Sequence, residues 1–141
     1  MATAGSGVAP FNFTVKAGAD LAISMTWLND AGAPMNLTGY SMMLSIRAFV
    51  GSPVPLLTIS SSASTGSYIA LGGTAGTIEL IFDHTDTGAF VAGGLPSPQI
   101  ASVGGLRVYQ LGVYDLQYTD NNGNIGFLME GNVMLDPQVT A

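Results

Sequence analysis

The segment LAISMTW, residues 21–27, decides the fold class of this chain. Its bulky apolar residues alternate with small or polar ones: Leu21, Ile23, Met25 and Trp27 on one side, Ala22, Ser24 and Thr26 on the other. Strict alternation over such a run is typical of a β-strand with one face in a hydrophobic core and one face toward solvent. We therefore expect a half-buried strand here.

The same two-residue period continues through most of the chain, and helical periodicity is almost absent. Turn residues separate the alternating segments, most clearly an Asn-Gly pair within Asp120–Asn124, which is typical of a tight hairpin. The predicted strands, seven or eight in all, include residues 11–15, 21–27, 40–47, 56–59, 68–71, 78–82, 107–119 and 127–135. This spacing predicts an all-β fold, a single antiparallel β-sandwich of the immunoglobulin-like kind, with a jelly roll as the alternative.

We expect one folded domain over residues 11–141, preceded by a flexible arm at residues 1–10 that is rich in Gly and Ala. Residues 92–106, AGGLPSPQIASVGGL, predict a loop longer than most connections in a compact domain. Thr85 or Asp86 is a candidate cap for one short helical turn before that loop. We expect the arm and the loop to be the main contact elements if the chain assembles.

The charge content is the most informative feature of the composition. Only 9% of the residues are charged, three Lys and Arg against nine Asp and Glu, whereas an ordinary soluble domain has about 25%. Charged residues are depleted at the cores of protein interfaces. The composition therefore predicts a subunit whose faces are covered in an assembly; the alternative is a monomer with a surface of Gly, Ser and Thr.

The net charge of −6 argues against nucleic-acid binding, because such binding depends on Lys and Arg that neutralise phosphates. It argues equally against attraction to an anionic membrane. The longest apolar-looking stretch, residues 40–57, is interrupted by Arg47, Gly51, Pro53 and Pro55, so we expect no membrane span. The segment MATAGSGVAP, residues 1–10, has neither the basic region nor the apolar core of a secretory signal peptide. The chain has no cysteine, which excludes disulfides, thiolate metal sites and a cysteine nucleophile.

Few residues are candidates for chemistry. His84 is the single histidine, and Asp83 beside it could orient it as a general base; a polar corner between a strand and a helix is the simpler interpretation. Asp120–Asn124 has a faint likeness to a calcium loop, but it holds one acid, and a hairpin uses the same residues. Glu79, Asp115 and Glu130 lie on outward strand positions, where solubility and edge protection explain them better than glycoside hydrolysis.

The remaining candidates are glycines and tyrosines. The segment Gly72–Gly76 leads into a strand rather than a helix, so it does not predict a phosphate cradle. Tyr114 and Tyr118 share the parity of the apolar Leu116 and are expected in the core, whereas Tyr109 has the opposite parity and could be exposed for stacking on a sugar. The sequence thus indicates no catalytic residue, no cofactor and no metal site, and we expect the protein not to be an enzyme.

Three stretches, taken in order, carry a resemblance to a known group of proteins. They are FNFTVKAGADLAISMTWLNDAGAPMNLTGYSMMLSIR (11–47), GGTAGTIELIFDHTDTGAF (72–90) and YQLGVYDLQYTDNNGNIGFLMEGNVMLDP (109–137). This order resembles small bacteriophage virion structural proteins and the N-terminal β-sandwich module of upper baseplate proteins. The chain departs from that pattern in the long loop 92–106 and in lacking a C-terminal extension typical of a fibre or receptor-binding module.

The resemblance implies a structural role in the virion, with assembly in the host cytoplasm and no catalytic residues. The leading hypothesis is a tail or neck subunit, or a module for fibre attachment, that forms a homo-oligomer and contacts other virion structural proteins. A capsid decoration protein is the first alternative. A carbohydrate-binding module for recognition of a host surface, with Tyr109 and loop 92–106 as its platform, is the second.

Overall fold

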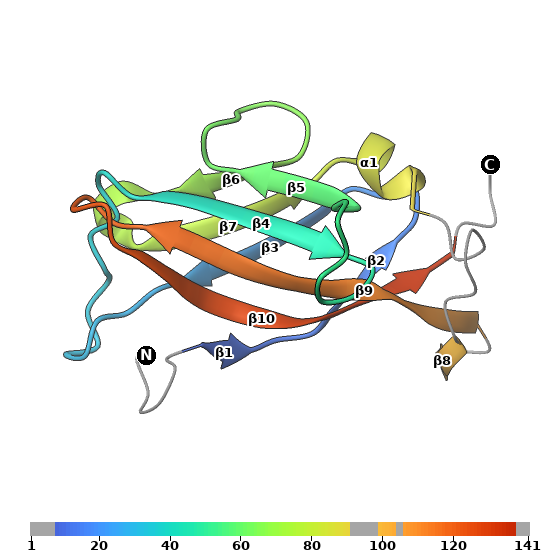
Figure 1. Ribbon diagram of the computed structural model, residues 1–141. Coiled ribbons are helices and arrows are strands. Elements are labelled where there is room, and N and C mark those ends of the chain that lie inside the picture. Colours follow the sequence, from blue (N-terminus) through green and yellow to red (C-terminus); the bar gives the residue numbers. More distant parts are fainter. Residues whose placement is uncertain (1–7, 91–98, 104–105, 138–141) are drawn as a thin grey trace.

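The computed structural model describes residues 8–90, 99–103 and 106–137, and these residues form two β-sheets packed face to face (Figure 1). The larger sheet has seven strands: β1 (Ala9–Pro10), β2 (Phe13–Lys16), β4 (Ser41–Arg47), β5 (Leu57–Ser60), β8 (Gln99–Val103), β9 (Leu106–Thr119) and β10 (Ile125–Asp136). The smaller sheet has three: β3 (Leu21–Thr26), β6 (Tyr68–Leu71) and β7 (Thr77–Phe82). A 3-10 turn, η1 (Gly73–Ala75), and a short helix, α1 (His84–Gly88), flank β7.

The strand order confirms the predicted all-β, immunoglobulin-like sandwich. The small sheet has the order β3-β7-β6, which is the B-E-D arrangement of an immunoglobulin domain. In the large sheet the order β10-β9-β4-β5 corresponds to G-F-C-C′. One detail of the prediction was wrong, because the large sheet is mixed rather than purely antiparallel: β1 and β2 both run parallel to β10.

The core lies between the sheets and follows the predicted alternation. Met42, Leu44 and Ile46 of β4 are buried, while the residues between them face outward or are half-buried. The same holds for Ile78, Leu80 and Phe82 of β7. Alternating burial of this kind arises because successive side chains of a strand point to opposite faces of the sheet.

Aromatic packing closes one end of the core. Trp27, just after β3, is buried, and its ring centroid lies 5.0 Å from that of Tyr118 and 5.9 Å from that of Tyr40. The hairpin between β9 and β10 lies at the predicted Asp120–Asn124 turn. Gly123 has the left-handed φ of 84° that such a turn needs, and the Asp120 carboxylate accepts the backbone N–H groups of Asn122 and Asn124.

Two predicted boundaries differ from the structure. Ala9 and Pro10, placed in the flexible arm, form β1 and pair with Met129 and Glu130 of β10; residues 1–7 lie outside the described residues. Within the predicted loop 92–106, Gln99–Val103 is strand β8, while residues 92–98 and 104–105 lie outside the described part. β9 begins at Leu106, whereas its pairing with β4 begins only at Val113. β8 pairs with Leu106–Tyr109 and so provides hydrogen-bond partners for the backbone N–H and C=O groups of that part of β9.

The cap of α1 also differs from the expectation. Its N-cap is Asp83, whose carboxylate accepts the N–H of Thr85, and not Thr85 or Asp86. Within the described ranges, no helix has the length and apolar character to cross a membrane.

Candidate functional site

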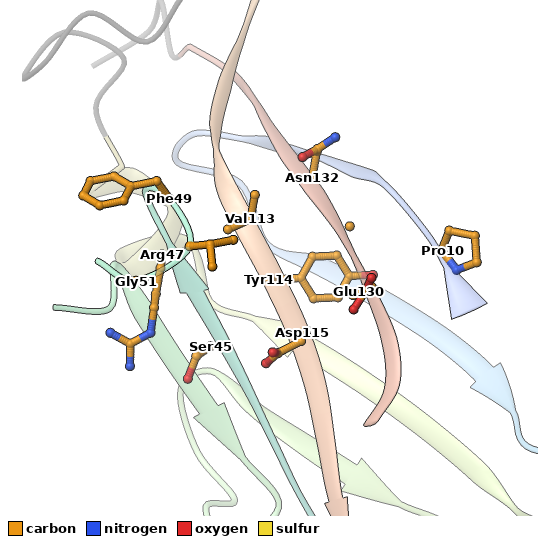
Figure 2. A pocket seen from close by; sticks show the side chains of 12 residues that line it. Pro10, Ser45, Arg47, Phe49, Gly51, Val113, Tyr114, Asp115, Glu130 and Asn132 are labelled. Carbon is orange, nitrogen blue, oxygen red and sulfur yellow. The ribbon is translucent and has the colours of Figure 1, made fainter. Parts of the chain in front are cut away.

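A surface depression lies on the outer face of the large sheet, where β4, β9 and β10 run side by side (Figure 2). It has a volume of about 540 Å³. The strand register builds it from two cross-strand rows that we call the outer-face rows. One row is Ser45, Asp115 and Glu130, and the other is Arg47, Val113 and Asn132. Pro10 of β1 and Phe49, after β4, lie at its margins.

The depression brings together one cation and two carboxylates. Arg47 lies on β4, Asp115 on β9 and Glu130 on β10, as Figure 2 shows. The Arg47 guanidinium is held in place by Nη1, which donates to the carbonyl oxygen of Ser52 at 2.8 Å. Among the described residues, none of these three charged groups has an ion-pair partner within 4.0 Å. The face therefore carries charges that no direct ion pair among the described side chains neutralises, although the Arg47 charge partly offsets that of Asp115.

The two carboxylates face each other directly across the β9–β10 pair. Like charges at opposed positions of an antiparallel pair repel and destabilise it. The pKa of Asp115 is raised by partial burial first and by the Glu130 charge second, while Arg47 opposes the shift. A cation placed over this pair would relieve the repulsion.

Exposed apolar side chains flank the outer-face rows. Phe49 and Val50, in the segment after β4, are 59% and 87% exposed. On the other side, Met43 and Phe127 belong to one cross-strand row through Gln117 and are 44% and 42% exposed. Isolated exposed apolar residues are ordinary, but a cluster around charged groups on one sheet face is typical of an interaction surface.

A second cluster of ionisable side chains lies beside α1. The Asp20 Oδ1 atom accepts the backbone N–H of His84 at 2.7 Å and lies 2.9 Å from its Nδ1, and Asp83 Oδ1 lies 3.6 Å from the same Nδ1. Sequence reasoning paired His84 with Asp83 and missed Asp20, which is 64 residues away along the chain. The contact fixes the segment before β3 to the start of α1, as in the polar corner that the sequence predicts.

This cluster gives a prediction about pH. The hydrogen bond that Asp20 accepts from the His84 imidazole, and then the charges of Asp83 and Asp20, raise the pKa of His84, while the same hydrogen bond lowers the pKa of Asp20. The His84 contribution to stability is present below its ordinary pKa and lost as the pH rises through the raised one. The Asp20 contribution is present above its ordinary pKa and lost as the pH falls through the lowered one.

The measurement is an NMR titration of the imidazole of His84, the single histidine of the chain. We expect its pKa to lie above the ordinary value of an imidazole and to fall toward that value in Asp20→Asn. Asp30→Asn, in an exposed turn, is the matched control and should leave the titration unchanged. An unchanged His84 titration in Asp20→Asn would contradict the contact.

Tyr114 and Tyr118 occupy the places that their parity predicts, whereas Tyr109, the candidate for an exposed position, does not. Tyr114 is buried and Tyr118 packs on Trp27, which confirms their role in the core. Tyr109 is half-buried. The Tyr114 hydroxyl donates to the carbonyl oxygen of Phe11 at 2.7 Å and so ties the segment between β1 and β2 to the sheet. Burial raises the pKa of Tyr114.

Tyr114→Phe removes this hydrogen bond and leaves the ring in place. We expect the free energy of unfolding to fall by about 1 kcal/mol, the usual net contribution of one such bond. Urea denaturation followed by circular dichroism measures it, with Tyr68→Phe as the control on the small sheet. Equal stability of Tyr114→Phe and the wild type would show that the bond contributes nothing.

The structure separates the acids that the sequence grouped together. Asp115 and Glu130 meet on the outer face of the large sheet, whereas Glu79 lies on the small sheet and accepts a hydrogen bond from Ser24. The Gly72–Gly76 segment forms η1 and leads into β7, as expected. In Asp120–Asn124, the carboxylate accepts N–H groups, which is the hairpin role.

Comparisons with known proteins assign no family to this chain. No family model matches the chain, and none of the curated proteins matches it. Among solved structures, a chicken TCR is similar, with 13% sequence identity and a TM-score of 0.44. The match covers 94% of this chain and 55% of the TCR chain, so this chain spans about half the length of that structure.

Proposed function

We propose that this protein is a non-enzymatic structural subunit of a bacteriophage particle, in the tail or neck or at a site of fibre attachment, which works by association with copies of itself and with other virion proteins. The observation that carries the proposal is the outer face of the large sheet. Its charged groups Arg47, Asp115 and Glu130 make no direct ion pair among the described side chains and are flanked by exposed apolar side chains. The particle itself is proposed from the ordered resemblance of residues 11–137 to small virion proteins.

The chemistry of this face favours association over catalysis. The depression holds two carboxylates and a guanidinium but no histidine. Its two hydroxyls already make hydrogen bonds, Ser45 with Thr58 at 3.2 Å and Tyr114 to the carbonyl oxygen of Phe11 at 2.7 Å. Burial of apolar surface contributes roughly 25 cal/mol per Å², so covering Phe49, Val50, Met43 and Phe127 would stabilise an assembly. The low charge content of the whole chain, 9%, also favours association, because charged residues are depleted at the cores of interfaces.

The copy number of this chain in purified particles tests the proposal. Quantitative mass spectrometry against the major shell protein should give a small number that matches tail or neck symmetry. A copy number comparable with that of the shell protein would instead favour the capsid decoration role. Absence from the particles would overturn the virion assignment, and selective binding to a glycan array would then favour the carbohydrate-binding alternative.

A further inference from the structure

We infer that the outer face of the large sheet binds a second copy of this chain about a twofold axis, with Arg47 of each copy placed against Asp115 and Glu130 of the other. This inference deepens the proposed function, because it names the partner and the surface. It depends on the proposed function only for the premise of self-association. It does not depend on the particle in which the protein works.

The first argument is the charge pattern of the face. Asp115 and Glu130 oppose each other across β9 and β10, and no cationic group among the side chains that the structure describes lies within 4.0 Å of either. Arg47 is the cation of the same face, and it likewise lacks a carboxylate partner among the described residues. A surface with a cation beside two anions is complementary to a copy of itself after a half turn. An interface of this kind, in which both copies use the same patch, is the commonest form of homodimer.

The second argument is the geometry of Arg47. The hydrogen bond from its Nη1 to the Ser52 carbonyl oxygen uses one N–H and holds the guanidinium at the face. The remaining N–H groups are available for carboxylates, which a guanidinium binds in the two-pronged manner that makes such pairs strong. Lys16, by contrast, is already paired with Asp136 at 3.3 Å.

The third argument is what surrounds the charges. Phe49 and Val50 on one flank, and Met43 and Phe127 on the other, are exposed apolar side chains on the same face. Stable interfaces combine an apolar area with paired polar groups, and the polar pairs fix how one copy is placed on the other. A second copy over the outer-face rows covers the apolar flanks and compensates the charges together.

Complementary charge reversal tests the register. Arg47→Glu places an acid against the two carboxylates of the other copy, and the double variant Asp115→Lys/Glu130→Lys places two cations against Arg47. Each variant alone should repel itself. An equimolar mixture restores both contacts, because Glu at position 47 then faces two lysines while Arg47 faces the native carboxylates. Glu79→Lys, on the outer face of the small sheet, is the matched control.

Sedimentation velocity measures the result, with circular dichroism as the check on folding. We expect the wild type and Glu79→Lys to dimerise, each interface variant to dimerise at least about 100-fold more weakly, and the mixture to regain the wild-type behaviour. If a charge reversal prevents folding, Arg47→Gln and Asp115→Asn/Glu130→Gln replace it, and both should weaken the dimer. Variants that dimerise like the wild type would overturn the inference.

Two further outcomes separate this inference from the proposed function. A wild type that stays monomeric at about 100 µM but is present in particles would overturn the self-docking face and leave the virion role in place. A mixture that stays monomeric while the wild type dimerises would also overturn the register, because the two copies would then meet without placing Arg47 against Asp115 and Glu130. A charge-dependent dimer of a protein absent from particles would overturn only the virion role.

Discussion

Replacing Trp27 with alanine is expected to lower the free energy of unfolding by about 3–5 kcal/mol, the usual loss for a large buried aromatic side chain. Trp27 is 7% exposed and contacts the rings of Tyr118 and Tyr40, with centroids at 5.0 and 5.9 Å. The substitution removes the indole from a cluster of three mutually contacting rings and leaves a cavity that the two remaining rigid side chains cannot fill. Aromatic contacts of this kind also add roughly 0.5–1.5 kcal/mol beyond their buried area.

The position of Trp27 makes the loss severe. An antibody domain joins its two sheets with a disulfide next to the core tryptophan, whereas this chain has no cysteine. The inward residues of β3, such as Ile23 and Met25, are only half-buried, so Trp27, just after the strand, is the buried side chain at this end of it. Its backbone also accepts the N–H of Met35 and donates to the carbonyl oxygen of Gly76. The indole therefore anchors several segments at once.

Urea denaturation followed by far-ultraviolet circular dichroism measures this loss, because the variant has no tryptophan fluorescence. Trp27→Phe is the conservative comparison and should lose clearly less, since a phenyl ring keeps part of the contact with Tyr118. Val54→Ala, at an exposed position, should change the free energy of unfolding by less than about 0.5 kcal/mol. A loss below about 1 kcal/mol for Trp27→Ala would show that the ring cluster does not hold this end of the sandwich.

The sandwich could be predicted from the sequence because alternation is a local property. In β4 and β7, every second residue is buried as the pattern indicates, since side-chain direction in a strand depends only on position along it. The Asp120–Asn124 hairpin was equally predictable, because a tight turn requires particular residues. In these places the local preference and the tertiary packing agree.

The candidate interaction surface could not be predicted, because it depends on register. A β-bulge lies between Phe127 and Met129 of β10. If the pairing of Phe127 with Gln117 continued without it, Met129 rather than Glu130 would stand opposite Asp115. The shift of one residue thus creates the carboxylate pair, and this shift was not predicted from the sequence. The contact between Asp20 and His84 escaped prediction for a similar reason, because it joins segments 64 residues apart.

The second large effect is expected at Gly112, which lies within β9 and is buried. A Cβ atom at this position would lie 2.1 Å from the carbonyl oxygen of Arg47 and 2.9 Å from its carbonyl carbon. Both are backbone atoms of β4, so relief requires the two strands to move apart and not merely a side chain to rotate. Gly112→Ala should therefore lower the free energy of unfolding by about 3 kcal/mol, at the upper end of the range for overpacking.

Gly88→Ala is the matched control, because its nearest heavy atom to an added Cβ is 3.6 Å away, which is ordinary van der Waals contact. Gly88 ends the short helix α1, and alanine there should leave stability unchanged or raise it slightly through lower entropy of the unfolded chain. Parallel denaturation curves of the two variants measure the difference. A Gly112→Ala variant as stable as Gly88→Ala would show that β4 and β9 can separate at this point without loss of stability.

The expected separation of β4 and β9 also moves Arg47 relative to Asp115, because these two residues lie on the two strands that move apart. The same substitution should then weaken the proposed dimer while the domain remains folded.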